Sequence, residues 1–339
     1  MTLYFGNTKT NGHATVTNFH LSHINTTFKE LQYNAPSYIT TSQYQTTIIH
    51  GSFFTIPQIV QEAKQQNPHS KVWAFVINES LQLPRIWTEN LKHADGLLYV
   101  SSWNYQQYHP NFPGKPGYVI HSWITSPELP IGKLKTPFAD YKYRFYTIST
   151  FNPRKNLDFL IRGFLDVFAY SEEAALFVKA GFDFPEEHAI RREVLLKLLH
   201  DYDPYPNVFF EWKYQSDEWI DNLHHTGNIY VNTSLGEATC LPLLQVPLEN
   251  SIIAPKEGGH CDYISDFHRI QTKPGKVEFT PLFREKMFWY YPEEVEWNIP
   301  QNDSYHEILC EIRDGKHTFG HIKHPITDVT AEWDQIFTQ

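Results

Sequence analysis

The chain has 339 residues, enough for one large or two medium domains, and a net charge of −10, which argues against a general nucleic-acid binder. Hydrophobic residues make up 41 % of the chain and aromatic residues 16 %, which excludes a disordered or fibrous protein. The sequence contains no run of about eighteen apolar residues, which excludes a membrane-spanning helix.

Two further features bear on the compartment and on the surface charge. The first residues form no basic segment followed by an apolar one, and three cysteines stand far apart, so we expect a cytoplasmic protein without a secretory signal. Residues 1–140 carry nine Lys or Arg and seven Asp or Glu, whereas the rest of the chain carries 19 and 31. A solvated acidic face explains this difference; alternatively, only the first part accepts an anionic partner.

Strand-like and helix-like segments alternate along the first 140 residues. Short β-branched or continuous apolar runs predict buried strands, and apolar residues at helical spacing predict a helix between two of them. We expect strands within Tyr44–Phe54, Lys71–Ile77, Gly96–Ser101 and Tyr118–His121, and a helix over Ile56–Gln66. Such alternation predicts parallel βαβ units.

The same alternation restarts after a proline- and glycine-containing stretch between Pro127 and Pro137, which predicts a linker. The expected strands are Tyr143–Ser149, Ala175–Ala180, Val208–Phe210, Ile229–Asn232 and Ser251–Ala254, and the expected helices are Lys155–Phe168, Ile190–Leu199 and Val329–Phe337. The fold class is therefore α/β with two successive open sheets, whose ligands bind at the carboxyl ends of the strands.

The first candidate site follows the strand expected over Tyr143–Ser149. It reads Ser149-Thr150-Phe151-Asn152-Pro153-Arg154-Lys155-Asn156. Two cations at the start of a helix are unfavourable beside the positive end of its dipole unless an anion binds there. Arg154 and Lys155 therefore indicate a diphosphate site; the alternative is an ordinary helix cap with solvated side chains.

Two more segments follow strands further along the chain. Ser234–Gln245 contains Glu237 in a glycine-containing loop, where a carboxylate can accept hydrogen bonds from sugar hydroxyls. Ala254–Asp262 contains the pair Gly258-Gly259, which permits close approach of a ligand to the backbone. The alternative for Ser234–Gln245 is a turn followed by the start of a helix, and the Gly-Gly pair by itself is weak evidence.

In this order and spacing, Ser149–Leu157, Glu237–Gln245 and Ile252–Gly259 resemble the motifs of the large family of retaining glycosyltransferases with the GT-B fold. Those motifs read G-T-x-x-P-R-K-N-L, E-G-x-G-L-P-x-x-E, and V-I-A with G-G downstream. The resemblance implies two Rossmann-like domains facing across a cleft. It implies an acceptor-binding domain over residues 1–138, a nucleotide-sugar-binding domain over 139–305, and a segment over 306–339 that crosses back to the first domain.

The resemblance also implies that the chain transfers a hexose or pentose from a nucleotide-diphosphate sugar to a hydroxyl group, with retention of configuration and without a metal or cofactor. Lys155 and Arg154 would stabilise the leaving diphosphate, and Glu237 would hold the sugar. Gln245 replaces the family's second glutamate, and Asn78 replaces a histidine that many members have. The implied donor-binding residues are Gly12, Asn78, Thr150, Trp212, Thr239, Cys240, Leu241 and Gln245.

Histidines mark the acceptor side. His50 and His121 end expected strands on one side of the first sheet, and His13 lies in an expected glycine loop, Asn11-Gly12-His13. A structural role is the alternative for each. The expected acceptor is a glycan in surface polysaccharide synthesis. The alternatives are a modified base in phage DNA, or a catalytically weak module that only binds nucleotide sugars.

Three signals point to other classes of site. Asp201-Tyr202-Asp203 matches the D-x-D pattern of metal-dependent transferases, but the prolines after it indicate a loop. His317, His321 and His324 are spaced for zinc, but a glycine and a proline among them indicate an irregular segment. The helix over Ile190–Leu199 carries cations beside leucines and could lie on a membrane, although packing against the second sheet is the simpler explanation.

Overall fold

The computed structural model describes residues 2–6, 12–30, 44–51, 53–122, 132, 134–181, 185–202, 207–277, 295–316, 321–322 and 329–337. The chain divides into two compact units, Met1–Ile124 with His324–Gln339, and Thr125–Lys323. The first unit thus ends before the expected boundary at residue 138, and the chain returns to it at 324, after the expected 306. Their roles as acceptor and donor domains stay predictions.

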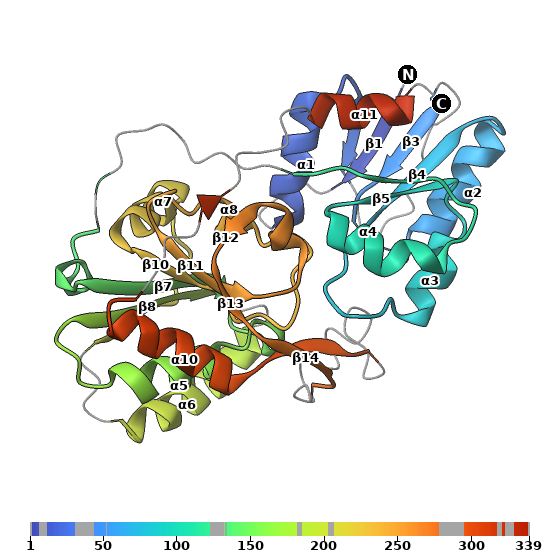
Figure 1. The fold of residues 1–339 in the computed structure, drawn as a ribbon. Helices are drawn as coiled ribbons and strands as arrows, with labels where there is room; N and C mark the ends of the chain where they lie inside the picture. Colours follow the sequence, from blue (N-terminus) through green and yellow to red (C-terminus); the bar gives the residue numbers. More distant parts are fainter. Residues whose placement is uncertain are drawn as a thin grey trace. The chain divides into compact units, whose positions relative to one another are not determined.

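The first unit is built on a six-stranded parallel sheet in the order β2-β1-β3-β4-β5-β6 (Figure 1). Its strands are β1 (Thr2–Gly6), β2 (Thr27–Glu30), β3 (Thr46–Ile49), β4 (Lys71–Val76), β5 (Gly96–Tyr99) and β6 (Gly117–Val119). Its helices are α1 (Gly12–His23), α2 (Ile56–Gln66), α3 (Arg85–Leu91), α4 (Ser102–Tyr108) and α11 (Val329–Phe337). The apolar run in β4 is buried after its first residue, as a strand covered on both faces requires.

The prediction of a glycine loop at Asn11-Gly12-His13 is wrong for Gly12 and His13. Gly12 and His13 form the start of α1, and Asn11 lies outside the described residues. Glycine is typical of loops, but it is also tolerated in the first turn of a helix, where the N–H groups have no partner inside the helix.

The second unit also contains a six-stranded parallel sheet, in the order β13-β11-β10-β7-β8-β9. Read from β9, this is the Rossmann order 3-2-1-4-5-6, which reverses direction between β7 and β10. Its strands are β7 (Tyr143–Thr150), β8 (Ala174–Gly181), β9 (Val208–Glu211), β10 (Ile229–Val231), β11 (Ser251–Pro255) and β13 (His268–Ile270). Four short strands form two further pairs outside this sheet: β12 (Ile264–Asp266) with β16 (His321–Ile322), and β14 (Thr272–Gly275) with β15 (Trp297–Pro300).

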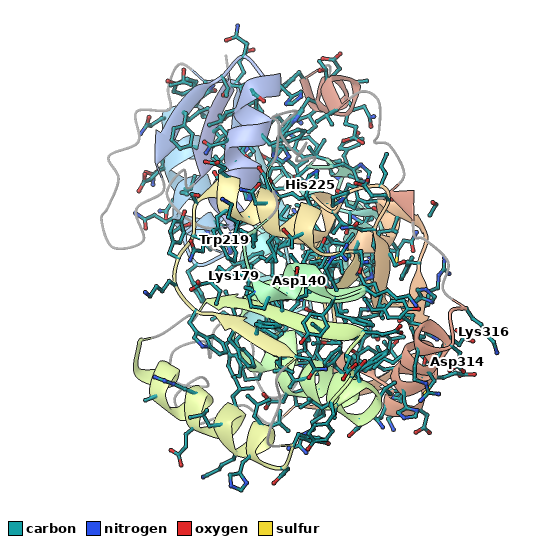
Figure 2. The ribbon with its side chains drawn as sticks, turned by 90° about the vertical axis from the view of Figure 1, so that its left-hand side faces the viewer. Asp140, Lys179, Trp219, His225, Asp314 and Lys316 are labelled. Carbon is teal, nitrogen blue, oxygen red and sulfur yellow. The ribbon has the colours of Figure 1, made fainter. Side chains whose placement is uncertain are left out.

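Helices cover both faces of the second sheet. One face packs against α5 (Leu157–Phe168), α6 (Pro185–His200) and α10 (Asn302–Arg313), which share one hydrophobic core with β7 and β8. The other face carries α7 (Asp217–Thr226), whose Trp219 packs against Phe177 of β8. Gly315, at φ 76°, ends α10 between the exposed Asp314 and Lys316 (Figure 2).

Helix α10 lies close to α5 at Gly163. A Cβ atom at this position would lie 2.4 Å from the ring of Tyr305, a side chain of α10 that is 1 % exposed. Alanine inside a helix is normally favoured over glycine by about 1 kcal/mol. Here we expect Gly163→Ala to destabilise the protein by roughly 1–3 kcal/mol, because the Tyr305 ring has to move within a packed core.

Urea unfolding measures this change, with Gly181→Ala as the matched control, since a Cβ at Gly181 meets no atom within 4 Å. A Gly163→Ala variant as stable as the wild type would show that the two helices can separate without cost.

The expected elements compare well with the observed ones. The helices Ile56–Gln66 and Val329–Phe337 are confirmed residue for residue, and the strands predicted in both halves are observed, most of them within two residues of their predicted ends. Among the described residues, no helix combines the length and apolar character needed to cross a bilayer.

Candidate active site at the switch point of the second sheet

The first motif follows β7, one of the two strands between which the sheet order reverses. Pro153–Lys155 forms a short 3-10 turn, in which the Asn152 side chain accepts a hydrogen bond from Lys155 N at 3.1 Å. Asn156 then adopts a left-handed conformation at φ 53°, which asparagine tolerates better than most residues, and α5 begins at Leu157. The helix expected from Lys155 therefore starts two residues later, and both cations lie in a separate turn before it.

The second motif follows β10, the other strand at the reversal. Its loop leads to the four-residue helix α8 (Leu241–Leu244), which begins after Cys240, a residue at φ 68°. Gln245 directly follows this helix. Because the carboxyl ends of β7 and β10 meet at one edge, the two motifs lie together.

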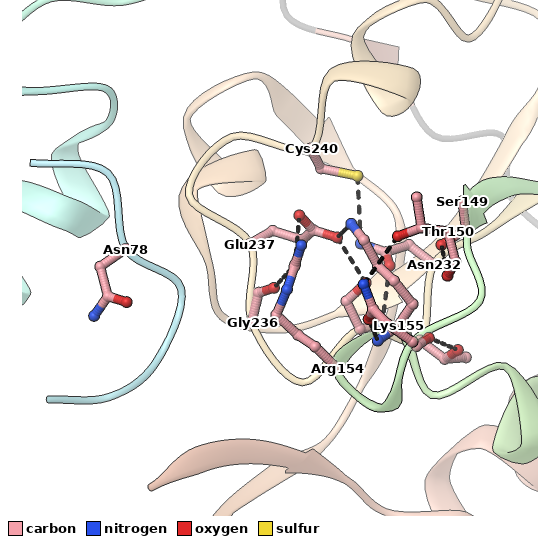
Figure 3. A network of polar contacts seen from close by, with 12 residues as sticks. Asn78, Ser149, Thr150, Arg154, Lys155, Asn232, Gly236, Glu237 and Cys240 are labelled. Atoms are coloured by element: carbon pink, nitrogen blue, oxygen red, sulfur yellow. Dashed lines mark hydrogen bonds and ion pairs between the residues drawn. The ribbon is translucent and has the colours of Figure 1, made fainter. Parts of the chain in front are cut away.

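The Glu237 carboxylate forms ion pairs with both cations of the first motif (Figure 3). Lys155 Nζ lies 2.5 Å from Glu237 Oε1, and Arg154 Nη1 lies 3.3 Å from Glu237 Oε2. Arg154 Nη1 also donates to the Gly236 carbonyl at 2.8 Å, and Ser234 Oγ donates to Glu237 Oε1 at 2.6 Å. The three residues expected to be catalytic therefore form one hydrogen-bonded cluster.

The cluster is almost fully buried, with side-chain exposures of 7 % for Glu237, 9 % for Arg154 and 15 % for Lys155. Burial by itself raises the pKa of Glu237. The charges of Lys155 and Arg154, with the hydrogen bonds from Lys155 and Ser234, outweigh burial and lower the pKa to about 2. Glu237 is therefore ionised at neutral pH, and the cluster of two cations and one anion carries a net charge of +1.

Backbone hydrogen bonds tie the three motifs together. Leu235 N donates to the Arg154 carbonyl at 2.8 Å, which joins the second motif to the first. Gly259 N donates to the Glu237 carbonyl at 2.8 Å, which joins the third motif to the second. The position of Glu237 thus depends on both neighbouring loops.

His260, which sequence reasoning did not single out, supports the third motif. Its Nε2–H donates to the Pro255 carbonyl at 2.8 Å, and its ring, 1 % exposed, lies against Gly258. A Cβ at Gly258 would come within 2.8 Å of this ring, and the φ of 142° there suits only glycine. Burial lowers the pKa of His260, so the ring is neutral. The Gly-Gly pair identified this loop in the sequence, but no sequence pattern indicated a role for His260 or Ser234.

The remaining donor-binding candidates of the second unit line or support the same loops. Thr150 Oγ1 accepts from Asn152 Nδ2 at 2.9 Å, next to the turn that holds the cations. Trp212, half-buried, stacks on Phe210 at 5.0 Å and packs edge-on against Phe151. Thr239, Cys240 and Leu241 lead into α8, and burial, with the charge of Glu237, raises the pKa of the Cys240 thiol to about 12.

The candidates of the first unit occupy structural positions there. Asn78 is fully buried, and its Nδ2 donates to Ser80 Oγ at 2.9 Å and Tyr108 Oη at 3.1 Å. His50, also buried, is hydrogen-bonded through Nδ1 to Tyr4 Oη and Thr17 Oγ1. His121 Nδ1 lies 2.7 Å from Glu332 Oε1 of α11. A role of these three residues, and of Gly12 and His13, in binding stays a prediction.

The two metal signals in the sequence fall partly outside the described residues, because Asp203, His317 and His324 are not among them. Asp201 and Tyr202 lie in the turn after α6, and His321 lies in β16. Within the described part of the chain, no group of three His, Cys, Asp or Glu side chains is placed to hold a metal ion.

The geometry suits an anionic ligand with several hydroxyl groups. The buried cations supply positive charge that needs no reorganisation, and an ionised carboxylate accepts hydrogen bonds only. A phosphorylated ligand with a polyol part would use both. The switch point of an open α/β sheet is the usual place for such ligands.

No protein-family model matches the sequence, and no curated protein does either. Solved structures do match its fold. The crystal structure of Anabaena HepE in complex with UDP-glucose matches with a TM-score of 0.61 and 12 % sequence identity, over 99 % of this chain and 98 % of HepE. The apo form of WaaB, a lipopolysaccharide outer core galactosyltransferase, matches with a TM-score of 0.59 and 13 % identity, over 100 % and 99 %.

A third match, the apo structure of OtsA, has a TM-score of 0.52 and 10 % identity. It covers 64 % of this chain, and the chain spans 60 % of OtsA. These matches, two of them along the full length, show that the chain has the GT-B fold.

Proposed function

We propose that this chain is a glycosyltransferase that transfers a sugar from a nucleotide-diphosphate sugar to an acceptor hydroxyl, with retention of configuration. The observation that carries the proposal is the contact of Arg154 and Lys155 with Glu237 at the switch point of the second sheet. A GT-B fold places donor chemistry at this edge, and the sequence motifs that resemble retaining members fall on these same residues.

Each residue of the cluster has a role in this reaction. Lys155 and Arg154 stabilise the negative charge that develops on the diphosphate as it leaves, while the Gly236 carbonyl keeps the guanidinium in place. Glu237, ionised at neutral pH, accepts hydrogen bonds from hydroxyls of the donor sugar. Gln245 binds the ribose through its amide. The acceptor hydroxyl attacks from the face that the diphosphate leaves, so positioning and charge stabilisation supply the catalysis.

The proposed reaction needs no metal ion, because the two side-chain cations provide the charge that a divalent ion supplies in other transferases. In an assay of sugar transfer, we therefore expect EDTA to leave the rate unchanged. A rate that depends on added magnesium or manganese would contradict this part of the proposal.

The similarity to HepE, solved with UDP-glucose, favours a UDP-sugar as donor. The similarity to a lipopolysaccharide outer core galactosyltransferase favours a saccharide acceptor in a surface glycan. A UDP-sugar donor and a saccharide acceptor are therefore the substrates to test first.

A thermal-shift panel of UDP-, GDP-, ADP- and CMP-sugars tests the proposal. We expect a UDP-sugar at a hundred times its dissociation constant to stabilise the protein by about 2.7 kcal/mol. NMR of the product then reports transfer and the anomeric configuration. If none of the four donors stabilises the protein, the proposal is wrong, and stabilisation without transfer or hydrolysis would favour a module that only binds nucleotide sugars.

A further inference from the structure

The first unit contains a cavity of about 430 Å³ that belongs to none of the three motifs. Thr46 and Lys71, which line it, are the first residues of β3 and β4, so it lies at the amino edge of the sheet. Phe337 at the end of α11 closes one side. Its volume is typical of pockets that bind small molecules, roughly 300–1,000 Å³.

The strand register brings the lining side chains onto one face of the sheet. Thr46 pairs with Lys71, and Trp73, two residues further along β4, points to the same side as Lys71. Trp73 pairs with Gly96 of β5, and a Cβ there would lie 2.2 Å from the indole ring. The indole therefore extends across β5 over a glycine, which makes room for it. Phe337, 39 % exposed, adds an apolar wall.

Several polar side chains at this cavity have no hydrogen-bond partner among the described residues, and two of them, His69 and Lys71, are exposed. Asn67, beside the cavity, is occupied, since it donates to the Tyr44 carbonyl and accepts from His69 N. In contrast, none of the hydrogen bonds and ion pairs of the described residues involves the side chains of Gln45, Thr46, His69, Lys71 or Trp73.

The chemistry of these groups selects a ligand. The Lys71 ammonium and the Trp73 N–H only donate hydrogen bonds, and no Asp or Glu is among the described residues that line the cavity. In a chain with a net charge of −10, a pocket whose described lining carries a lysine and no carboxylate favours an anion. An amide, a hydroxyl and an apolar wall beside the cation suit a small polyhydroxylated ring better than a bare ion.

We propose that this cavity binds an acidic sugar, with its phosphate or carboxylate at Lys71 and His69, its hydroxyls at Gln45 and Thr46, and a carbon face against Phe337. The site is separate from the proposed transfer reaction, and its occupancy does not require a nucleotide sugar.

Ligand-observed NMR on the full chain tests this site with glucose 6-phosphate, glucuronate, glucose and inorganic phosphate. We expect saturation transfer to the ring protons of the two acidic sugars and a much weaker signal for glucose. Tighter binding of glucose 6-phosphate would identify a phosphate as the preferred anionic group, and tighter binding of glucuronate a carboxylate. Inorganic phosphate has no carbon-bound proton, so its binding is followed by 31P line broadening. Phosphate binding as tightly as glucose 6-phosphate would show a simple anion patch and overturn the proposal.

Variants locate the binding. Lys71→Gln is expected to weaken binding of the acidic sugars roughly tenfold or more, since a charged hydrogen bond is lost. Phe337→Ala is expected to weaken binding of the sugars but not binding of phosphate. Lys92→Gln makes the same change at an exposed lysine that pairs with Glu89, outside the cavity, and is expected to have no effect. Equal binding by Lys71→Gln and Lys92→Gln would overturn the proposal. The stabilisation of the protein by nucleotide sugars, measured on the same variants, is expected to stay unchanged. Failure of the acidic-sugar site can therefore be distinguished from failure of the proposed transfer reaction.

Discussion

Replacing Lys155 by alanine is expected to lower the rate of sugar transfer by roughly 10²–10³-fold, the usual cost of removing one group that stabilises charge in the transition state. The Lys155 side chain is 15 % exposed and its Nζ lies 2.5 Å from Glu237 Oε1, so water cannot fully replace its charge. Initial rates of nucleotide diphosphate release, measured at saturating donor, report the effect.

Lys142→Ala is the matched control for charge. Lys142 directly precedes β7, at the opposite end of this strand from the first motif, and its side chain is 60 % exposed in an ion pair with Glu173. A Lys155→Ala variant with a rate close to that of Lys142→Ala would show that Lys155 takes no part in the reaction.

Replacing Glu237 by glutamine is expected to destabilise the protein without donor by about 3–5 kcal/mol at pH 7, because Arg154 and Lys155 are left buried without their counter-charge. The pKa of Glu237 falls from the ordinary 4.5 to about 2 on folding, so the unfolded chain binds more protons. The stabilisation is therefore complete above pH 4.5 and disappears as the pH falls toward 2.

Urea unfolding between pH 7 and pH 3 measures both effects. Wild-type stability should decrease with falling pH more steeply than that of Glu237→Gln, and the two curves should converge. The control Glu173→Gln removes a carboxylate that is 66 % exposed and 3.6 Å from Lys142, where little change is expected. Parallel pH curves for wild type and Glu237→Gln would contradict the strong pairing of Glu237.

The fold was predictable because each unit repeats one simple pattern. Continuous apolar runs such as Lys71–Val76 form the central strands, and the spaced apolar residues of α5 lie on the face that packs against them. Short strands such as β2 and β13 were not foreseen, since three or four residues of mixed polarity carry no periodic signal.

The candidate site was predictable in its residues but not in its local geometry. The three motifs identified Arg154, Lys155 and Glu237, and the structure places their side chains in contact. The left-handed Asn156 and Cys240, which separate the cations from α5 and begin α8, could not be read from spacing. Neither could the contacts of Ser234 and His260, because these residue types occur in most loops without such a role.

The return of α11 to the first unit affects the order in which the protein can form during translation. The indole of Trp333, 1 % exposed, packs against Tyr4, His20 and Phe75, which leave the ribosome more than 250 residues earlier. The nascent first unit exposes this aromatic face until α11 has been synthesised. The second unit is one uninterrupted stretch, so it can complete its fold first although it is made later.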